Sequence, residues 1–270
     1  MPSAEASVTD REQLKQQWTR TIFEAQCDGK KIAPPSTSFG ELSLEEAYEV
    51  QARVAAEHVS VGHRQIDWMV GATSFAILEQ MKGILDGPMY GFMTSESVCG
   101  QQGEIRRSDY SLGIEAEIGV VLEQSLRGPG ITTLDVQHAA GGVVALVELL
   151  QTRLEGPGSV PDGTADNSAH GGIVIGSRLA SATGFDFIHE GVVIRKNGRA
   201  WLSGCGAEAL GSPLHVVAWL ANELGQRGQA IEAGHLVATG SLTSILTPEV
   251  GDVVDISFAH LGAIQLGIVE

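Results

Sequence analysis

The chain has 270 residues, of which 43% are hydrophobic and 19% are charged, so its composition excludes a disordered chain and allows a substantial core. Its 17 Lys and Arg against 33 Asp and Glu give a net charge of −16, which disfavours binding to nucleic acid phosphates or anionic membranes. Cys27, Cys99 and Cys205 lack the paired spacing of a disulfide framework, and no apolar stretch approaches the roughly 20 residues of a membrane span. We therefore expect a cytoplasmic globular protein.

The first part of the chain carries two helical patterns. Apolar residues recur at helical spacing over 10–26, and a second helix is expected to begin after Ser43, which forms a capping-box pattern with Glu46. We expect residues 1–70 to form an N-terminal helical region. Residues 71–270 are expected to form a β-rich, metal-binding catalytic domain that is continuous with it.

From about residue 100 the chain changes to short runs rich in Val and Ile, separated by Gly, Pro and Asp, which is a pattern typical of strands. The expected strands are 114–122, 143–149, 172–176, 192–196, 235–239, 252–258 and 262–269. Asn197-Gly198, between two such runs, predicts a hairpin. Ser212 predicts the N-cap of a helix that ends at Gly225 or Gly228. Few helices and many short strands indicate an α+β or mixed β-rich domain rather than a regular parallel doubly wound sheet.

The segment GIEAEIGVV, residues 113–121, places two carboxylates in an otherwise apolar run. In a strand, Glu115 and Glu117 share one face about 7 Å apart, so they can converge on one cation. Glu148 stands alone in a still more apolar run, where an unpaired charge is costly. Three acids gathered around Mg²⁺ or Mn²⁺ would form a hard-oxygen site that leaves positions for water and substrate.

Two simpler interpretations of these acids stay open from the residues alone. A half-solvated antiparallel strand also presents alternating residues such as Glu115 and Glu117. Glu148 is also consistent with a buried acid paired with Arg153, because buried charges are usually paired. The metal site is therefore indicated by the three acids together rather than by any one of them.

Several segments, in order from about residue 40 to the C-terminus, resemble one family. They are GIEAEIGVVL, ALVELLQTR, TADNSAHGGIVIG, GCGAEALGSPLHVVAWLANELGQRG and VATGSLTSILTPEVGDVVDISFAHLGAIQL. Together they are similar to the 2-keto-4-pentenoate hydratase and 4-oxalocrotonate decarboxylase group of the fumarylacetoacetate hydrolase superfamily. The resemblance implies an α+β fold, namely the superfamily's mixed β-sandwich or roll with an N-terminal helical region.

The resemblance implies two sets of site residues. The group's divalent-metal ligands match Glu115, Glu117 and Glu148. Its catalytic candidates match Arg153, Asp166 and Ser241. Asp166 lies in a loop similar to the group's D-N loop, and Ser241 lies in a Gly-containing loop near the substrate carboxylate, although both are also ordinary turn residues. His170, beside the D-N loop, is interpreted as a structural histidine rather than a proton shuttle.

Met69 departs from the group's pattern. The resemblance implies a lysine at this position that orients or neutralises the substrate's carboxylate or enolate, whereas methionine has neither a charge nor a hydrogen-bond donor. Three explanations stay open. Another cation, such as Arg64, Lys82 or Arg153, reaches the site; the substrate differs; or the protein binds metal with little of the group's activity.

The leading hypothesis is a carbon–oxygen lyase of aromatic meta-cleavage catabolism, a hydratase that adds water to a 2-hydroxy-2,4-dienoate to give a 4-hydroxy-2-oxo acid. The alternative is a carboxy-lyase that acts on a 2-oxo-dienedioate of the 4-oxalocrotonate type. The expected partner is a small anionic 2-oxo or 2-hydroxy acid, with no nucleic acid and no membrane. The resemblance further implies a homo-oligomer, and Met69 leaves open a subunit that supports another enzyme of the pathway.

Overall fold

A computed structural model describes residues 8–99, 103–107 and 111–270. The chain divides into two compact units, which we call the helical unit and the β unit. The helical unit comprises Met1–Gln65 and Thr152–Ala169, and the β unit comprises Ile66–Gln151 and His170–Glu270. The predicted boundary at residue 70 lies near the first observed boundary. The prediction placed Thr152–Ala169 in the β-rich domain, whereas this segment groups with the helical unit. This segment leaves the sheet between two neighbouring strands and makes its contacts with helices instead.

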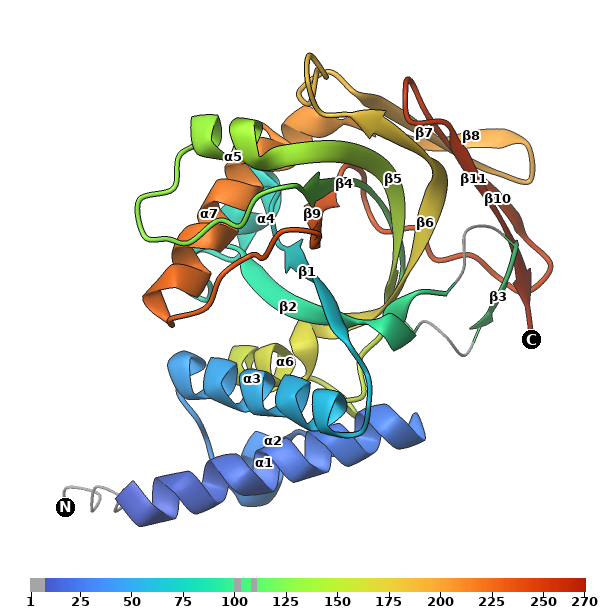
Figure 1. Cartoon of the computed structure of the whole chain (residues 1–270). Coiled ribbons are helices and arrows are strands. Elements are labelled where there is room, and N and C mark those ends of the chain that lie inside the picture. Colours follow the sequence, from blue (N-terminus) through green and yellow to red (C-terminus); the bar gives the residue numbers. More distant parts are fainter. Residues whose placement is uncertain (1–7, 100–102, 108–110) are drawn as a thin grey trace. The chain divides into compact units, whose positions relative to one another are not determined.

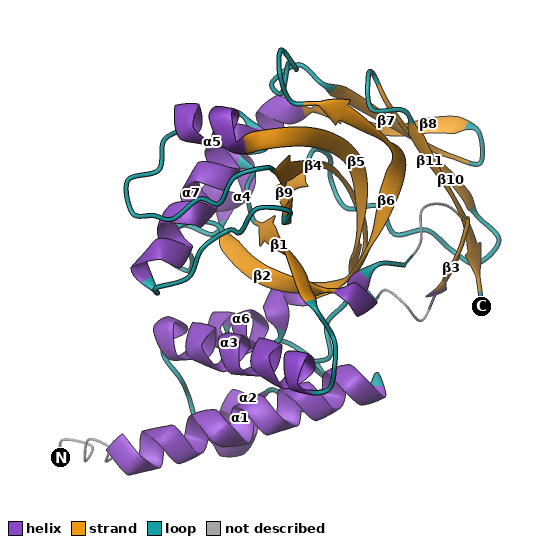
Figure 2. Ribbon diagram, viewed as in Figure 1, coloured by secondary structure: helices purple, strands orange, loops and turns teal. Residues whose placement is uncertain are grey.

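The helical unit is built from α1 (Val8–Asp28), α2 (Pro35–Phe39), α3 (Leu44–Ser60) and α6 (Val160–Ala165). Both predicted N-terminal helices are present, and Ser43 caps α3 through the expected reciprocal bonds with Glu46. The apolar stripe of α1 buries Trp18 and Ile22, and α3 packs against both α1 and α6. Figure 2 shows these helices in purple. No helix in the described part of the chain is long and apolar enough to cross a bilayer.

The β unit contains a strongly curved six-stranded sheet (Figure 1). In spatial order its strands are β2 (Met89–Thr94), β1 (Gln65–Gly71), β9 (Leu236–Ser241), β4 (Gly113–Leu122), β5 (Ala140–Leu150) and β6 (His170–Ser181). The strands β1 and β9 are parallel, whereas β9, β4, β5 and β6 pair in antiparallel fashion. The two longest antiparallel pairings therefore both involve β5.

A second sheet of five strands completes the β unit. In spatial order its strands are β3 (Gly103–Arg106), β11 (Ala263–Val269), β10 (Val253–Phe258), β7 (Gly191–Lys196) and β8 (Arg199–Cys205). The predicted hairpin joins β7 to β8, and Asn197 and Gly198 have φ angles of 52° and 76°, the left-handed values that such a tight turn requires. The strand β11 of this sheet packs against β5 and β6 of the six-stranded sheet, so the two sheets contact each other.

All seven predicted strands are present, within a few residues of their expected ends, whereas β1, β2 and β3 were not predicted. The sequences of β1 and β2, QIDWMVG and MYGFMT, have few of the β-branched residues that mark a strand. The predicted helix after Ser212 is α7 (Pro213–Gln226), which packs on β9 and β4. Two shorter helices, α4 (Phe75–Gln80) and α5 (Thr133–Ala139), complete the unit.

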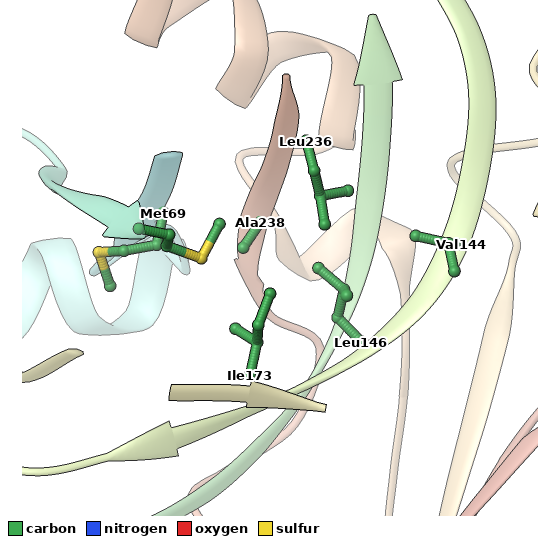
Figure 3. Packing of buried hydrophobic residues seen from close by; sticks show 7 residues of the cluster. Met69, Val144, Leu146, Ile173, Leu236 and Ala238 are labelled. Carbon is green, nitrogen blue, oxygen red and sulfur yellow. The ribbon is translucent and has the colours of Figure 1, made fainter. Parts of the chain in front are cut away.

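The concave face of the six-stranded sheet holds an apolar cluster. Its buried members are Met69, Met93, Val144, Leu146, Ile173, Leu236 and Ala238, and Figure 3 shows those it labels converging from β1, β5, β6 and β9. Because side chains alternate along a strand, Val144, Leu146 and Glu148 of β5 point to the same face. This face of the sheet is therefore apolar at Val144 and Leu146 and becomes acidic farther along β5, at Glu148.

Candidate metal centre

The pairing of β4 with β5 brings the three predicted acids together. Glu115 lies directly opposite Glu148 in this antiparallel register, and Glu117 is two residues farther along β4 on the same face. One carboxylate oxygen from each side chain can be chosen so that all three lie within 4.8 Å of one another. A single divalent cation between these oxygens can contact all of them.

These carboxylates are removed from water to different extents. The side chains of Glu117 and Glu148 are 0% and 1% exposed, whereas Glu115 keeps part of its surface open to a cavity. Burial raises the pKa of Glu115 to about 8, with a further contribution from the charge of Glu117. Burial, followed by the neighbouring acid, raises the pKa of Glu117 and of Glu148 well above the usual range. Such a cluster favours either protons or a bound cation.

Two hydrogen bonds orient the buried carboxylates. The backbone N–H of Gly240 donates to Oε2 of Glu117 at 2.9 Å, and Nδ1 of His170 lies 2.6 Å from Oε1 of Glu148. Among the described residues, no hydrogen-bond donor reaches the buried Oε1 of Glu117. A buried acceptor oxygen without a donor, beside two further carboxylates, is the kind of ligand that binds a hard divalent cation such as Mg²⁺ or Mn²⁺.

The end of β9 supports this arrangement through Gly240. Its φ angle is +89°, and a Cβ atom there would lie 2.0 Å from Oγ1 of Thr73, so a side chain is excluded. The N–H of Gly240 is thereby directed at Glu117. The Ser241 hydroxyl donates to the carbonyl of Thr243 at 2.7 Å.

A cavity of ≈ 520 Å³ opens beside Glu115. Its wall consists of residues 71–74 at the end of β1 and just beyond it, part of α4, residues 241–245 from the end of β9 onward, Ser203 of β8, and Glu208 of the 3₁₀ turn after β8. All of these residues belong to the β unit. Ser241 therefore shares the cavity with Glu115, and it also lies opposite Glu117 in the register of β4 and β9. The cavity gives a small ligand access to the carboxylate cluster.

The other two predicted catalytic residues, Arg153 and Asp166, lie in the helical unit and contact each other. Nε of Arg153 is 2.6 Å from Oδ1 of Asp166, the backbone N–H of Arg153 donates to Oδ2 at 2.9 Å, and both side chains are buried. The simpler interpretation paired Glu148 with Arg153. In the structure Arg153 pairs with Asp166, and Glu148 contacts His170. The roles of Arg153 and Asp166 in catalysis stay predictions.

The sequence did not place two residues of this region correctly. His170 contacts Glu148 rather than serving only the core, and Glu208 reaches the cavity from β8's end. His170 stands beside the D-N loop in the sequence, but no fixed spacing relates it to Glu148, and Glu208 belongs to no motif that would signal its position. The segment 88–93 is largely the buried strand β2, and it supplies none of the described lining residues.

The raised acidic pKa values predict that the metal-free protein loses stability as the pH rises. Glu115 has a folded pKa of about 8 against an ordinary value of 4.5, so its protonated form stabilises the fold fully below about pH 4.5, and this contribution is lost as the pH rises through 8. We expect the Tm of EDTA-treated protein to fall by on the order of 5 °C between pH 5 and pH 8. Differential scanning fluorimetry with EDTA, and again with saturating Mg²⁺, measures the effect.

The matched variant Glu115→Gln isolates this contribution from other titrating groups, because it keeps the shape of the side chain without its ionisation. Its Tm is expected to depend less on pH than that of the wild type. Mg²⁺ should reverse the wild-type trend, since a bound cation favours the ionised carboxylates. Equal slopes for wild type and variant would show that Glu115 does not titrate in this range.

Comparison with known proteins bears on this site. The sequence model described as "Fumarylacetoacetate (FAA) hydrolase C-terminal" matches residues 68–269, which include the whole carboxylate cluster. The chain belongs to this family. The resemblance drawn from the sequence is thereby confirmed, as is the predicted α+β fold of the fumarylacetoacetate hydrolase type.

Similar members of the family include enzymes of two kinds. The chain is 29% identical to the 2-keto-4-pentenoate hydratase of Paraburkholderia xenovorans (strain LB400), over 94% of each chain. It is 31% identical to the 4-oxalocrotonate decarboxylase of Pseudomonas putida, over 90% of this chain and 92% of the relative. A solved structure of 4-oxalocrotonate decarboxylase from Pseudomonas putida G7, complexed with magnesium and adipate, matches with a TM-score of 0.90 and 31% identity, covering 99% of this chain and all of the other.

Proposed function

We propose that the protein is a divalent-metal-dependent hydratase that adds water to a 2-hydroxy-2,4-dienoate and releases a 4-hydroxy-2-oxo acid. The observation that carries this proposal is the cluster of Glu115, Glu117 and Glu148, whose oxygens lie within 4.8 Å of one another beside an open cavity. The relatives named as hydratases, at 29% to 32% identity, support the reaction class.

The three carboxylates would hold Mg²⁺ or Mn²⁺, which would supply Lewis-acid stabilisation to the enolate of a bound 2-oxo acid. Gly240 and His170 hold two of the carboxylates in place through their hydrogen bonds. Ser241 offers a polar group on the wall of the same cavity. We keep it, together with the Arg153–Asp166 pair, as the catalytic candidates for orienting substrate and moving protons.

Decarboxylation of a 2-oxo-dienedioate is the second candidate function. It is supported by the similarity, over nearly the whole of both chains, to a solved 4-oxalocrotonate decarboxylase. The same three carboxylates would hold the ion whose Lewis-acid chemistry decarboxylation of a 2-oxo acid also needs. The two reactions are therefore distinguished by their products rather than by the metal site.

The test is to incubate the purified protein and Mg²⁺ with a 2-hydroxy-2,4-dienoate and, separately, with a 2-oxo-dienedioate. We expect loss of the dienoate's ultraviolet absorbance and a 4-hydroxy-2-oxo acid by NMR, with no carbon dioxide released. Carbon dioxide from the dienedioate, without hydration of the dienoate, would reject the hydratase in favour of the decarboxylase. EDTA should abolish either activity.

We further propose a cytoplasmic homo-oligomer as the working state of the protein. A non-catalytic subunit that supports another enzyme of the pathway is the alternative that Met69 suggests. Met69 is 1% exposed and packs in the apolar cluster, so no charge stands where the resemblance implies lysine. Turnover by the wild-type protein would reject this alternative, whereas turnover only after Met69→Lys would support it.

A further inference from the structure

We infer that the cavity selects a 2-oxo or 2-hydroxy acid that has one carboxylate and an uncharged, apolar far end. This inference rests on the proposed function, because it assumes that the single carboxylate is held at the acidic cluster. It goes further by naming Glu208 and the apolar cavity wall as the features that discriminate between monoacids and dicarboxylic acids.

The ionisable side chains that line the cavity are both acidic. Glu115 and Glu208 are the ionisable lining residues, and no Lys, Arg or His lies among the lining residues that the structure describes. Glu115 belongs to the carboxylate cluster, whereas Glu208 comes from the 3₁₀ turn after β8 (Gly206–Glu208) and is exposed. A second carboxylate on the ligand would therefore meet a like charge and no counter-charge.

The position where the resemblance implies lysine does not supply a cation either. Met69 lies beneath the cavity wall, because a Cβ atom on the wall residue Gly71 would be 3.8 Å from the methyl group of Met69. Figure 3 shows Met69 directed toward Ala238 and the other apolar side chains. A methionine here leaves the adjoining part of the site without a charge or a donor.

The remaining cavity wall is suited to an apolar tail. Ile77 of α4 and Ile245 are 42% and 49% exposed, and Ala76 and Leu242 line the same space. Large aliphatic side chains exposed at a cavity gain from contact with an apolar ligand, because that contact removes apolar surface from water. The far end of the ligand is thus expected to contact hydrocarbon.

A dicarboxylic acid loses on three counts. Its second carboxylate would give up water without an opposite charge, it would approach Glu208, and it would enter the field of a chain with a net charge of −16. A monoacid of the same length avoids the first two, and its single negative charge is repelled less by the net charge of the chain. We expect a preference for the monoacid of about tenfold or more, the size expected when a buried carboxylate lacks a partner.

The test compares two stable six-carbon ligands, 2-oxohexanoate and 2-oxoadipate, which differ only in a terminal methyl or carboxylate. Isothermal titration calorimetry with saturating Mg²⁺ measures both, and oxalate serves as a chelator without a tail. We expect oxalate to bind and 2-oxohexanoate to bind at least about tenfold more tightly than 2-oxoadipate. If oxalate fails to bind, the proposed function falls; if oxalate binds and 2-oxoadipate binds as tightly as 2-oxohexanoate, this inference alone is overturned.

Two variants test which lining residues cause the preference for the monoacid over the dicarboxylic acid. Glu208→Gln should tighten 2-oxoadipate binding by about threefold to fivefold, because it removes a partly screened like charge, and it should leave oxalate and 2-oxohexanoate unchanged. Ile77→Lys should tighten 2-oxoadipate binding by about tenfold by adding a counter-charge to the wall. Glu249→Gln is the control, since Glu249 is exposed and is not a described lining residue. If both test variants keep the wild-type preference between 2-oxohexanoate and 2-oxoadipate, this cavity wall does not select the ligand and the inference is overturned.

Discussion

Replacing Glu148 with Gln is expected to weaken Mn²⁺ binding by at least about 100-fold and to abolish metal-dependent turnover, because it removes one of three charged oxygen ligands. Gln has nearly the same shape as Glu and can still accept a hydrogen bond from His170, so the local structure should persist. Titration of Mn²⁺ followed by electron paramagnetic resonance measures the loss directly, without reference to catalysis.

The stability of the metal-free variant provides an internal check on the Glu148 prediction. Glu148 is 1% exposed and lies beside two other acids, so Gln, which cannot ionise, should leave the metal-free Tm unchanged or raise it at higher pH. Glu123→Gln, an exposed position just after β4, is the matched control and should bind Mn²⁺ normally. A wild-type Mn²⁺ titration for Glu148→Gln would exclude Glu148 as a ligand.

Replacing His170 with Ala is expected to weaken Mn²⁺ binding by about 10-fold to 100-fold, the usual effect of removing a group that orients a metal ligand. His170 is buried, and its Nδ1 lies 2.6 Å from Oε1 of Glu148. A carboxylate that binds a metal is ionised and can only accept a hydrogen bond, so Nδ1 must donate it. The histidine is therefore a positioning residue that acts through Glu148.

A conservative variant separates positioning from a general structural role. His170→Asn places an amide N–H near the position of Nδ1 and should recover much of the Mn²⁺ affinity that His170→Ala loses. His189→Ala is the control, because His189 also pairs with an acid, Asp186, but both residues are exposed. If His170→Ala folds and binds Mn²⁺ as tightly as the wild type, the contact with Glu148 has no role in metal binding.

Local sequence signals located most secondary structure but not the sheet order. Alternating or continuous apolar runs predicted seven strands, because a strand's pattern depends on neighbours within a few residues. The capping box at Ser43 and the Asn197-Gly198 turn were likewise local, and both are present. The strand β1 was missed because Asp67 interrupts its apolar pattern, yet Asp67 is buried and accepts a hydrogen bond from the N–H of Leu236.

The sequence by itself determined that Glu115 and Glu117 share one face of a strand, since alternation of side chains follows from backbone geometry alone. Together with the resemblance, it also selected Glu148 as their companion. Only the tertiary structure decided that Glu148 lies opposite Glu115, that His170 contacts it, and that Glu208 lines the cavity. These contacts depend on strand register and on the meeting of two sheets, which are set by packing between segments far apart in the chain.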